Sequence, residues 1–157
     1  MIEEEIFRSV LGRFSTGITV VTAREANGRD HGMTVSAFSS VSLAPPLVMV
    51  CIGHDASMHG ILMAADRIGI NILGSAQEAM SRRFAEQDSD RFEGVGFARG
   101  ESGVALLEDA LAHLECHVIS RQEAGDHTLM VAEVERARAN EGKPLLYYRG
   151  GYAQLER

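Results

Sequence analysis

Five hydroxyl side chains lie close together in the segment from His31 to Gly53, whose other residues are typical of β-sheet. They are Thr34, Ser36, Ser39, Ser40 and Ser42. One interpretation is a half-exposed strand whose polar residues face water, as in an antiparallel sheet with one solvated face. The other is a row of hydrogen-bond donors that line a bound ligand. The local pattern favours the solvated strand, so the choice depends on the rest of the chain.

Three potential metal ligands, His113, Cys116 and His117, lie within one short stretch. Alternate side chains of a strand point to opposite faces, so His113 and His117 share one face while Cys116 points to the other. A zinc site needs ligands that converge on one point. The spacing therefore favours solvent-facing histidines, and we expect no metal site here.

Other chemical motifs fail on spacing or on context. Gly94, Gly96 and Gly100 do not match G-x-G-x-x-G and lack the strand–turn–helix setting of a dinucleotide site. Lys143 follows a glycine but precedes a proline, unlike the lysine of a P-loop. No G-x-S-x-G nucleophile elbow is present. We therefore expect neither a Rossmann nucleotide site nor serine-hydrolase chemistry.

The length and charge of the chain limit the class of protein further. Its 157 residues fit one domain spanning 1–157. The formal net charge of −7 argues against a general nucleic-acid binder, because a phosphate backbone is held mainly by clustered lysine and arginine. A small phosphate ligand held by one local arginine remains compatible with this charge.

The cysteines and the N-terminus suggest a cytoplasmic protein. Cys51 and Cys116 lie in apolar runs without a C-x-x-C or metal spacing, so we expect buried free thiols. The first ten residues, MIEEEIFRSV, are acidic and lack the apolar core of a signal peptide. No run approaches the roughly 18 apolar residues of a membrane-spanning helix.

The elements that must position these residues are mostly strands. Phe7, Val10, Leu11 and Phe14 follow helical spacing and predict a helix that ends near Gly17. Strands are expected at 17–23, 31–44, 47–53, 67–73, 110–122, 127–139 and 144–155. The first two strands form a hairpin that turns at 27–28. A proline pair ends the second strand, because proline cannot donate to a strand ladder. Two further helices are expected at 55–66, capped by Asp55 or Ser57, and at 75–87, begun by a Ser75–Glu78 capping box, and a loop at 88–103.

Strands that follow one another through short turns predict a mostly β fold. We expect an antiparallel β-barrel with peripheral helices. The histidines, hydroxyl residues and arginines of interest would then lie on neighbouring strands and on the segments that connect them.

An ordered set of short motifs resembles a known family. The motifs are GITVVT, HGMTVSAFSSVSLAPPLVMVCI, INIL, RRFA, LECHV, GDHTLMVAEV and PLLYYRGGYAQL, and they run from about Phe7 to Leu155. This set resembles the short-chain flavin reductases, the reductase components of two-component flavin monooxygenases. The resemblance implies a split β-barrel of the FMN-binding type, a homodimer, and FMN or FAD as the flavin. It also implies NADH or NADPH as co-substrate and a partner oxygenase that receives the reduced flavin.

The resemblance implies the ligand interpretation for the hydroxyl segment. Thr34, Ser36 and Ala37 would meet the isoalloxazine edge and the ribityl chain, and Ser39 and Ser40 would approach the phosphate end. The physical logic agrees, because an isoalloxazine needs a wall to lie on and donors along the edge where negative charge grows on reduction.

Residues further along the chain would complete the flavin site by the same resemblance. Cys51, Ile52 and Ser57 would continue the flavin wall. Arg83 and Phe84, in RRFA, match the helix that reaches the flavin, and Arg83 could pair with the phosphate bidentately. Without the resemblance, Arg83 would be interpreted as a residue on a solvated helix face.

Three more residues complete the set implied for the site. His127, in GDH, matches the family histidine on the nicotinamide side, although by itself it is a hairpin turn residue. Tyr152, in GGY, could border the same pocket or pack on an edge strand. Gly17 would allow a ligand or backbone to approach closely.

The function implied is hydride transfer from a reduced nicotinamide to a flavin, in which holding two planar rings in contact supplies much of the catalysis. Two alternatives stay open. One is a split-barrel protein that binds a flavin without turnover, and the other is a self-contained flavin-dependent oxidase.

Overall fold

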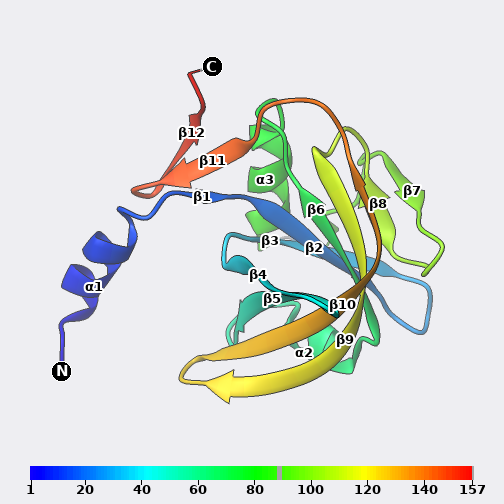
Figure 1. The fold of residues 1–157 in the computed structure, drawn as a ribbon, viewed down its shortest axis with the longest axis horizontal. Coiled ribbons are helices and arrows are strands. Elements are labelled where there is room, and N and C mark those ends of the chain that lie inside the picture. Colours follow the sequence, from blue (N-terminus) through cyan, green and yellow to red (C-terminus); the bar gives the residue numbers. More distant parts are fainter. Residues whose placement is uncertain (88–89, 157) are drawn as a thin grey trace.

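The computed structural model describes residues 1–87 and 90–156. Seven antiparallel strands form its main sheet, in the order β3-β2-β6-β9-β10-β5-β4 (Figure 1). Their bounds are β2 Thr19–Arg24, β3 Asp30–Val35, β4 Phe38–Leu43, β5 Pro46–Gly53, β6 Arg67–Ile72, β9 Ala112–Ala124 and β10 His127–Ala139.

The connection between β3 and β4 shows that this sheet is rolled. The two strands form opposite edges of the sheet, yet only Ser36 and Ala37 separate them. A flat sheet of seven strands would hold its edges about 29 Å apart. The step from Val35 to Phe38 spans at most about 10 Å. The sheet must therefore curl until its two edges lie close together, which agrees with the split barrel that the resemblance implied.

The sheet has apolar residues on both faces because the barrel is filled inside and covered outside. Val21, Val50, Ile70 and Met130 are fully or almost fully buried in the barrel interior. On the outer face, Ile18 and Val20 pack in a second cluster with Leu107, Leu145 and Phe84. This second layer explains why β2 is buried at five consecutive positions instead of alternating.

Short elements form the outer layer and a separate arm. The helices are α1 Glu4–Leu11, α2 His59–Ala64 and α3 Glu78–Ala85. A hairpin of β7 Phe97–Arg99 and β8 Ala105–Leu107 covers one face, while β1 Thr16–Gly17, β11 Leu145–Tyr148 and β12 Gly151–Gln154 form a three-stranded sheet. Figure 1 shows α1 and the β11–β12 hairpin extending away from the barrel.

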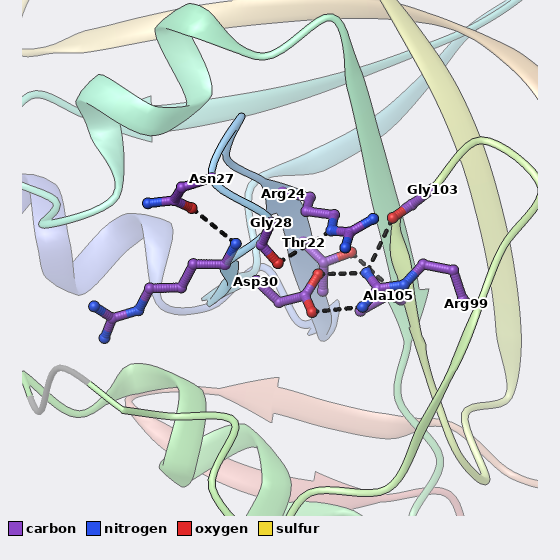
Figure 2. Close-up of polar contacts among 9 residues, drawn as sticks. Thr22, Arg24, Asn27, Gly28, Asp30, Arg99, Gly103 and Ala105 are labelled. Atoms are coloured by element: carbon purple, nitrogen blue, oxygen red, sulfur yellow. Dashed lines mark hydrogen bonds and ion pairs between the residues drawn. The ribbon is translucent and has the colours of Figure 1, made fainter.

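Polar contacts fasten the β7–β8 hairpin to the barrel (Figure 2). Arg99 donates to both carboxylate oxygens of Asp30, at 2.6 and 2.8 Å, and also to the carbonyl of Gly103. The hydroxyl of Thr22 donates to the carbonyl oxygen of Ala105 at 2.8 Å. These bonds join β2 and β3 to the outer layer and fix the strand that carries Asp30.

Several expected elements differ in the structure. The expected strand 31–44 is two strands, β3 and β4, because the chain changes edge at Ser36 and Ala37. The expected last strand, 144–155, is the β11–β12 hairpin, which turns at Arg149 and Gly150, both with positive φ. The segment 88–103, expected as a loop, contains β7, and residues 88–89 lie outside the described part of the chain.

The helices also begin differently from the prediction. Neither Asp55 nor Ser57 caps α2, which starts at His59, and no side chain caps α3. The expected Ser75–Glu78 capping box is therefore wrong. Instead Gln77 accepts from the backbone N–H of Gly74 at 2.9 Å. The helix α1 ends at Leu11 and not near Gly17 as predicted, so Phe14 lies outside it, and none of the residues of α1 is buried in the single chain.

None of the described helices is long and apolar enough to cross a membrane.

Candidate functional site

The hydroxyl segment lies where the barrel splits. Ser36, Ala37, Ser39 and Ser40 are exposed in the single chain. The backbone N–H of Cys51 donates to the carbonyl of Ala37 at 3.0 Å. This bond holds the connection between β3 and β4 against β5. The hydroxyl of Ser39 donates to the carbonyl of Ser40 at 2.9 Å. Accessible hydroxyl and backbone groups therefore follow one another along this edge.

Thr34 differs from the other hydroxyl residues, because its side chain turns toward α3. Its hydroxyl donates to the carbonyl oxygen of Ser81 at 2.6 Å. Tyr152, from β12, reaches the same residue, with its phenol oxygen 2.8 Å from the Ser81 hydroxyl. Thr34 and Tyr152, which are 118 residues apart in the sequence, thus both bond to Ser81. The sequence analysis did not single out Ser81.

On β5, Cys51 and Ile52 point in opposite directions. The side chain of Ile52 is fully buried in the barrel interior, so only its backbone can meet a ligand at the surface. Cys51 is half-buried on the other face, and burial raises the pKa of its thiol. The thiol is consequently protonated at neutral pH and serves as a small apolar surface, not as a nucleophile.

The two residues predicted in α3 support a neighbouring loop. Arg83 donates to the carbonyl oxygens of Asp90, Arg91 and Glu93, at 3.0, 3.0 and 2.9 Å. Phe84 is fully buried and packs edge-to-face on Phe92, with 5.0 Å between ring centroids. Both residues hold the segment after α3 against β3.

That segment presents Arg91, which the sequence analysis missed. The guanidinium of Arg91 donates to the carbonyl of Gly32 at 2.8 Å and to the hydroxyl oxygen of Ser57 at 3.1 Å. Since Ser57 accepts there, its own hydroxyl hydrogen is available to another acceptor. A sequence signal existed, because Arg91 is the single basic residue in the acidic segment 88–98.

Arg91 and Ser57 line a pocket of about 270 Å³. Its other lining residues are Arg29, Asp30, His31, Gly32, Met58, Ile61, Gln87 and Phe92. The one aspartate among them is already paired bidentately with Arg99 (Figure 2), and His31 is paired with Glu25 at 2.5 Å. Burial lowers the pKa of Arg91, but an arginine stays charged at neutral pH. The pocket therefore favours an anionic group.

Gly32 shows how closely this site is packed. A methyl group added there would lie 2.8 Å from Cε1 of Phe84 and 3.3 Å from Cε2 of Phe92. A glycine at this place lets the two rings approach the backbone of β3. Its carbonyl is then free to position Arg91.

His127 occupies the first position of β10, opposite Gly53 at the end of β5. Its Nδ1 lies 2.7 Å from Oδ1 of Asp126, and this hydrogen bond lowers the pKa of the Asp126 carboxyl. A methyl group added at Gly53 would lie 3.6 Å from Nε2 of His127. The aspartate therefore orients an exposed imidazole whose Nε2 lies over the end of β5.

The arm carries the remaining predicted residue. Gly17 pairs with Leu146 of β11, and the space where its side chain would stand is open. Figure 1 shows this arm and the β9–β10 hairpin as separate parts of the molecule.

The histidines considered as metal ligands have protein partners. His113 Nε2 bonds the carbonyl of Leu107 at 2.6 Å, and His117 Nδ1 contacts the Arg67 guanidinium. Both are half-buried, so they face solvent only in part. Cys116 is buried between these strands, and burial raises its pKa to about 12. Within residues 1–87 and 90–156, no group of three or more potential ligands could hold a metal ion.

Comparison with known proteins places this chain in a family. A model described as "Flavin reductase like domain" matches residues 11–156. An NADH-dependent flavin reductase of a Rhodococcus species is 44% identical over 153 residues, which cover 95% of this chain and 85% of that protein. The reductase component of 4-nitrophenol 4-monooxygenase/4-nitrocatechol 2-monooxygenase of Rhodococcus opacus is 40% identical over 149 residues, 95% of this chain and 80% of that protein.

A solved structure gives the same result. The NADH:FAD oxidoreductase SgcE6 of Streptomyces globisporus, determined with NAD and FAD fragments, superposes with a TM-score of 0.92 at 37% identity. The match covers 99% of this chain and 96% of SgcE6. The chain belongs to the flavin reductase-like family, and the resemblance inferred from the sequence motifs is confirmed.

Proposed function

We propose that this protein is an NAD(P)H-dependent flavin reductase. It transfers a hydride from a reduced nicotinamide to FMN or FAD and supplies the reduced flavin to a partner monooxygenase. The observation that carries the proposal is a pocket that favours an anion at the start of β3, together with a row of accessible polar groups that follows the end of the same strand at the barrel split. Family relatives named as NADH-dependent flavin reductases and as monooxygenase reductase components support it.

The residues present fit a flavin at this edge. A flavin combines a flat apolar ring that has a polar edge, a hydroxylated chain and a phosphate. The hydroxyl of Ser36 and the exposed backbone of Ser36 and Ala37 suit the ring edge. Cys51, whose backbone bonds to Ala37, offers a small neutral surface beside them. The Arg91–Ser57 pocket suits a phosphate, because a guanidinium and a hydroxyl converge there.

This placement changes the role proposed for Arg83. Three backbone carbonyls already accept from its guanidinium, so it builds the loop and Arg91 is the better phosphate ligand. Ser39 and Ser40, which pair with Met49 and Val48 of β5, stay as proposed contacts of the flavin. Thr34, Phe84 and Tyr152 contribute by fixing α3 and β3 behind the site.

A bound flavin supplies the electron acceptor, and the protein has to position the donor beside it. His127 is proposed to orient the nicotinamide, because Asp126 fixes its ring and its Nε2 is exposed over Gly53. No strong general base is needed for a hydride transfer, so orientation carries most of the catalytic effect.

A homodimer is part of the proposal. The polar edge at the barrel split and the apolar face of α1 are both exposed in the single chain. A second copy of the chain would bury them. We also place the reaction in the cytoplasm, where reduced nicotinamides are made. The two cysteines, both free, are compatible with that compartment.

The test is NADH oxidation under air with purified protein and added FMN or FAD. Catalytic oxidation above the rate of flavin alone is expected. Flavin binding without NADH oxidation would instead select a non-catalytic flavin-binding protein. Oxidation of an organic amine or alcohol without NADH would select a self-contained oxidase.

A further inference from the structure

A polar network joins the β9–β10 hairpin to the connector between β5 and α2, residues 54–58. His54 Nε2 lies 2.5 Å from Oε2 of Glu123, and the hydroxyl of Thr128 donates to Oε1 of the same carboxylate at 2.8 Å. His59 Nε2 lies 2.9 Å from the Thr128 hydroxyl oxygen. The two imidazole rings meet edge-to-face with centroids 5.2 Å apart. Two histidines, a threonine and a glutamate therefore form one continuous chain of contacts.

The hydrogen count assigns each partner its role. The Thr128 hydroxyl has one hydrogen and gives it to Glu123, so it must accept from a protonated Nε2 of His59. The carboxylate can only accept, so His54 also carries its hydrogen on Nε2. Bonds from Thr128 and His54 lower the pKa of Glu123, which keeps this acceptor ionised at neutral pH.

The network begins where the strand ladder stops. The last pair between β5 and β10 is Gly53 with His127, and beyond it the backbone N–H of His54 donates to the carbonyl of Asp126 at 2.9 Å. Thr128 is completely buried, whereas Glu123 is largely exposed, so the network runs from the interior to the surface. It fixes the connector and the hairpin relative to each other.

These two segments carry the two halves of the proposed site. The connector holds Ser57, which faces the anion-favouring pocket, and the hairpin holds His127, which is proposed to face the nicotinamide. We propose that Glu123 and Thr128 are positioning residues, which set the flavin side of the site against its nicotinamide side through His54 and His59. This inference rests on the proposed function.

The network has to act on hydride transfer more than on binding. Each segment can still bind its own ligand when the network is broken, but the two rings no longer meet in the reactive geometry. Small displacements of reacting groups reduce rates strongly, by about 100-fold for a displacement of about 1 Å. The titratable groups that act on Glu123 are His54 and His59, and neither is removed in the variants below. Asp126 acts on His54 and His127, and it is also kept.

The experiment compares Thr128→Val, Thr128→Ser and Glu123→Gln. Thr128→Val keeps the branched shape for the strand but removes the hydroxyl, while Thr128→Ser retains it. Glu123→Gln alters an exposed side chain, so folding is not at risk. Glu135→Gln is the matched control, because Glu135 also pairs across strands, with Arg67 at 2.7 Å, away from this network.

Single-turnover flavin reduction by NADH under anaerobic conditions gives the rate, and fluorescence titration gives the flavin dissociation constant. We expect Thr128→Val and Glu123→Gln to slow reduction about 10-fold with less than a twofold change in flavin affinity. A variant that combines Thr128→Val with Glu123→Gln should be no slower than the slower of the two single variants, because both changes break the same network. Thr128→Ser and Glu135→Gln should stay within twofold of the wild type.

Wild-type rates in Thr128→Val and Glu123→Gln would overturn this inference while leaving the proposed function intact. Equal losses of rate and flavin affinity, or a Thr128→Ser variant as slow as Thr128→Val, would also overturn it. No flavin reduction by the wild-type protein would overturn the proposed function and this inference with it.

Discussion

Arg83 donates to the backbone carbonyl of Arg91 at 3.0 Å, while the guanidinium of Arg91 itself reaches Ser57 at 3.1 Å. The first arginine therefore builds the loop, and the second presents its charge to the pocket. This arrangement separates two roles that a motif such as RRFA cannot separate, because the motif ends before the loop begins. It also shows how an acidic protein can offer a local cationic site.

Replacing Arg91 by glutamine should weaken FMN binding and spare riboflavin, which lacks the phosphate. The lost charge-assisted contact corresponds to about 1.5–3 kcal/mol, or about 10- to 100-fold in the dissociation constant for FMN. Quenching of flavin fluorescence measures both constants. Arg82→Gln is the control, because Arg82 lies on α3 over the Tyr152 ring and is paired with Glu78. A similar loss for FMN and riboflavin would remove Arg91 from the phosphate site.

The strands of the barrel could be predicted in outline, because alternating and β-branched segments separated by turn residues are a local signal. The break at Ser36 and Ala37 could not, since a continuous strand and two strands on opposite edges have the same local pattern. What decides between them is how the whole sheet curls, which depends on three pairings between distant segments, β2–β6, β6–β9 and β5–β10. The β11–β12 hairpin was missed for a related reason, because its turn requires positive φ at Arg149, a residue type that rarely signals it.

The residues of the candidate site also fall into those that the sequence could predict and those that it could not. Ser57 and His127 lie beside polar partners in segments whose motifs could be matched by sequence. Arg91 was missed because its partners, Gly32 and Ser57, are 59 and 34 residues away in the chain. Ile52 was predicted as a flavin contact, but the alternation of β5 places its side chain in the core.

Replacing His127 by alanine should affect the use of NADH more than the binding of flavin. The imidazole is exposed and bonds to the neighbouring Asp126, so its loss should leave the fold unchanged. We expect the KM for NADH to rise about 10-fold, as for the loss of one hydrogen-bonded contact, with the flavin dissociation constant within twofold. Steady-state kinetics with varied NADH and a flavin titration provide the two numbers.

An Asp126→Asn variant is the companion to that experiment. It keeps a side chain of the same size but removes the carboxylate that orients the ring, so a smaller rise in the KM for NADH is expected. If flavin affinity falls as much as NADH use in His127→Ala, the histidine does not act on the nicotinamide side.

The apolar face of α1 should form part of a dimer interface. Phe7, Val10 and Leu11 of α1 are between 48% and 60% exposed in the single chain, and no residue of the helix is buried. Phe14, which follows the helix, is 78% exposed. An exposed apolar stripe of this kind marks an interaction surface. Val10→Asp should convert the dimer into a monomer in sedimentation-velocity measurements. Glu5→Gln, on the same helix, should leave the mass unchanged, and a wild-type protein that sediments as a monomer would contradict the prediction.

The two thiols should differ in reactivity, and flavin should change only one of them. Burial and the nearby Glu135 and Glu115 carboxylates raise the pKa of Cys116 to about 12. Because the thiolate is the reactive form, a raised pKa lowers the thiolate fraction at pH 8, to about one in ten thousand for Cys116. Cys51 is half-buried at the proposed flavin wall, and its pKa is raised by burial alone.

A disulfide reagent at pH 8 should therefore modify Cys51 slowly in the native protein and modify Cys116 only after unfolding. Added FMN should slow the modification of Cys51 further, while a Cys51→Ser variant should show no native reaction. Unchanged reactivity of Cys51 at saturating FMN would place the flavin away from β5.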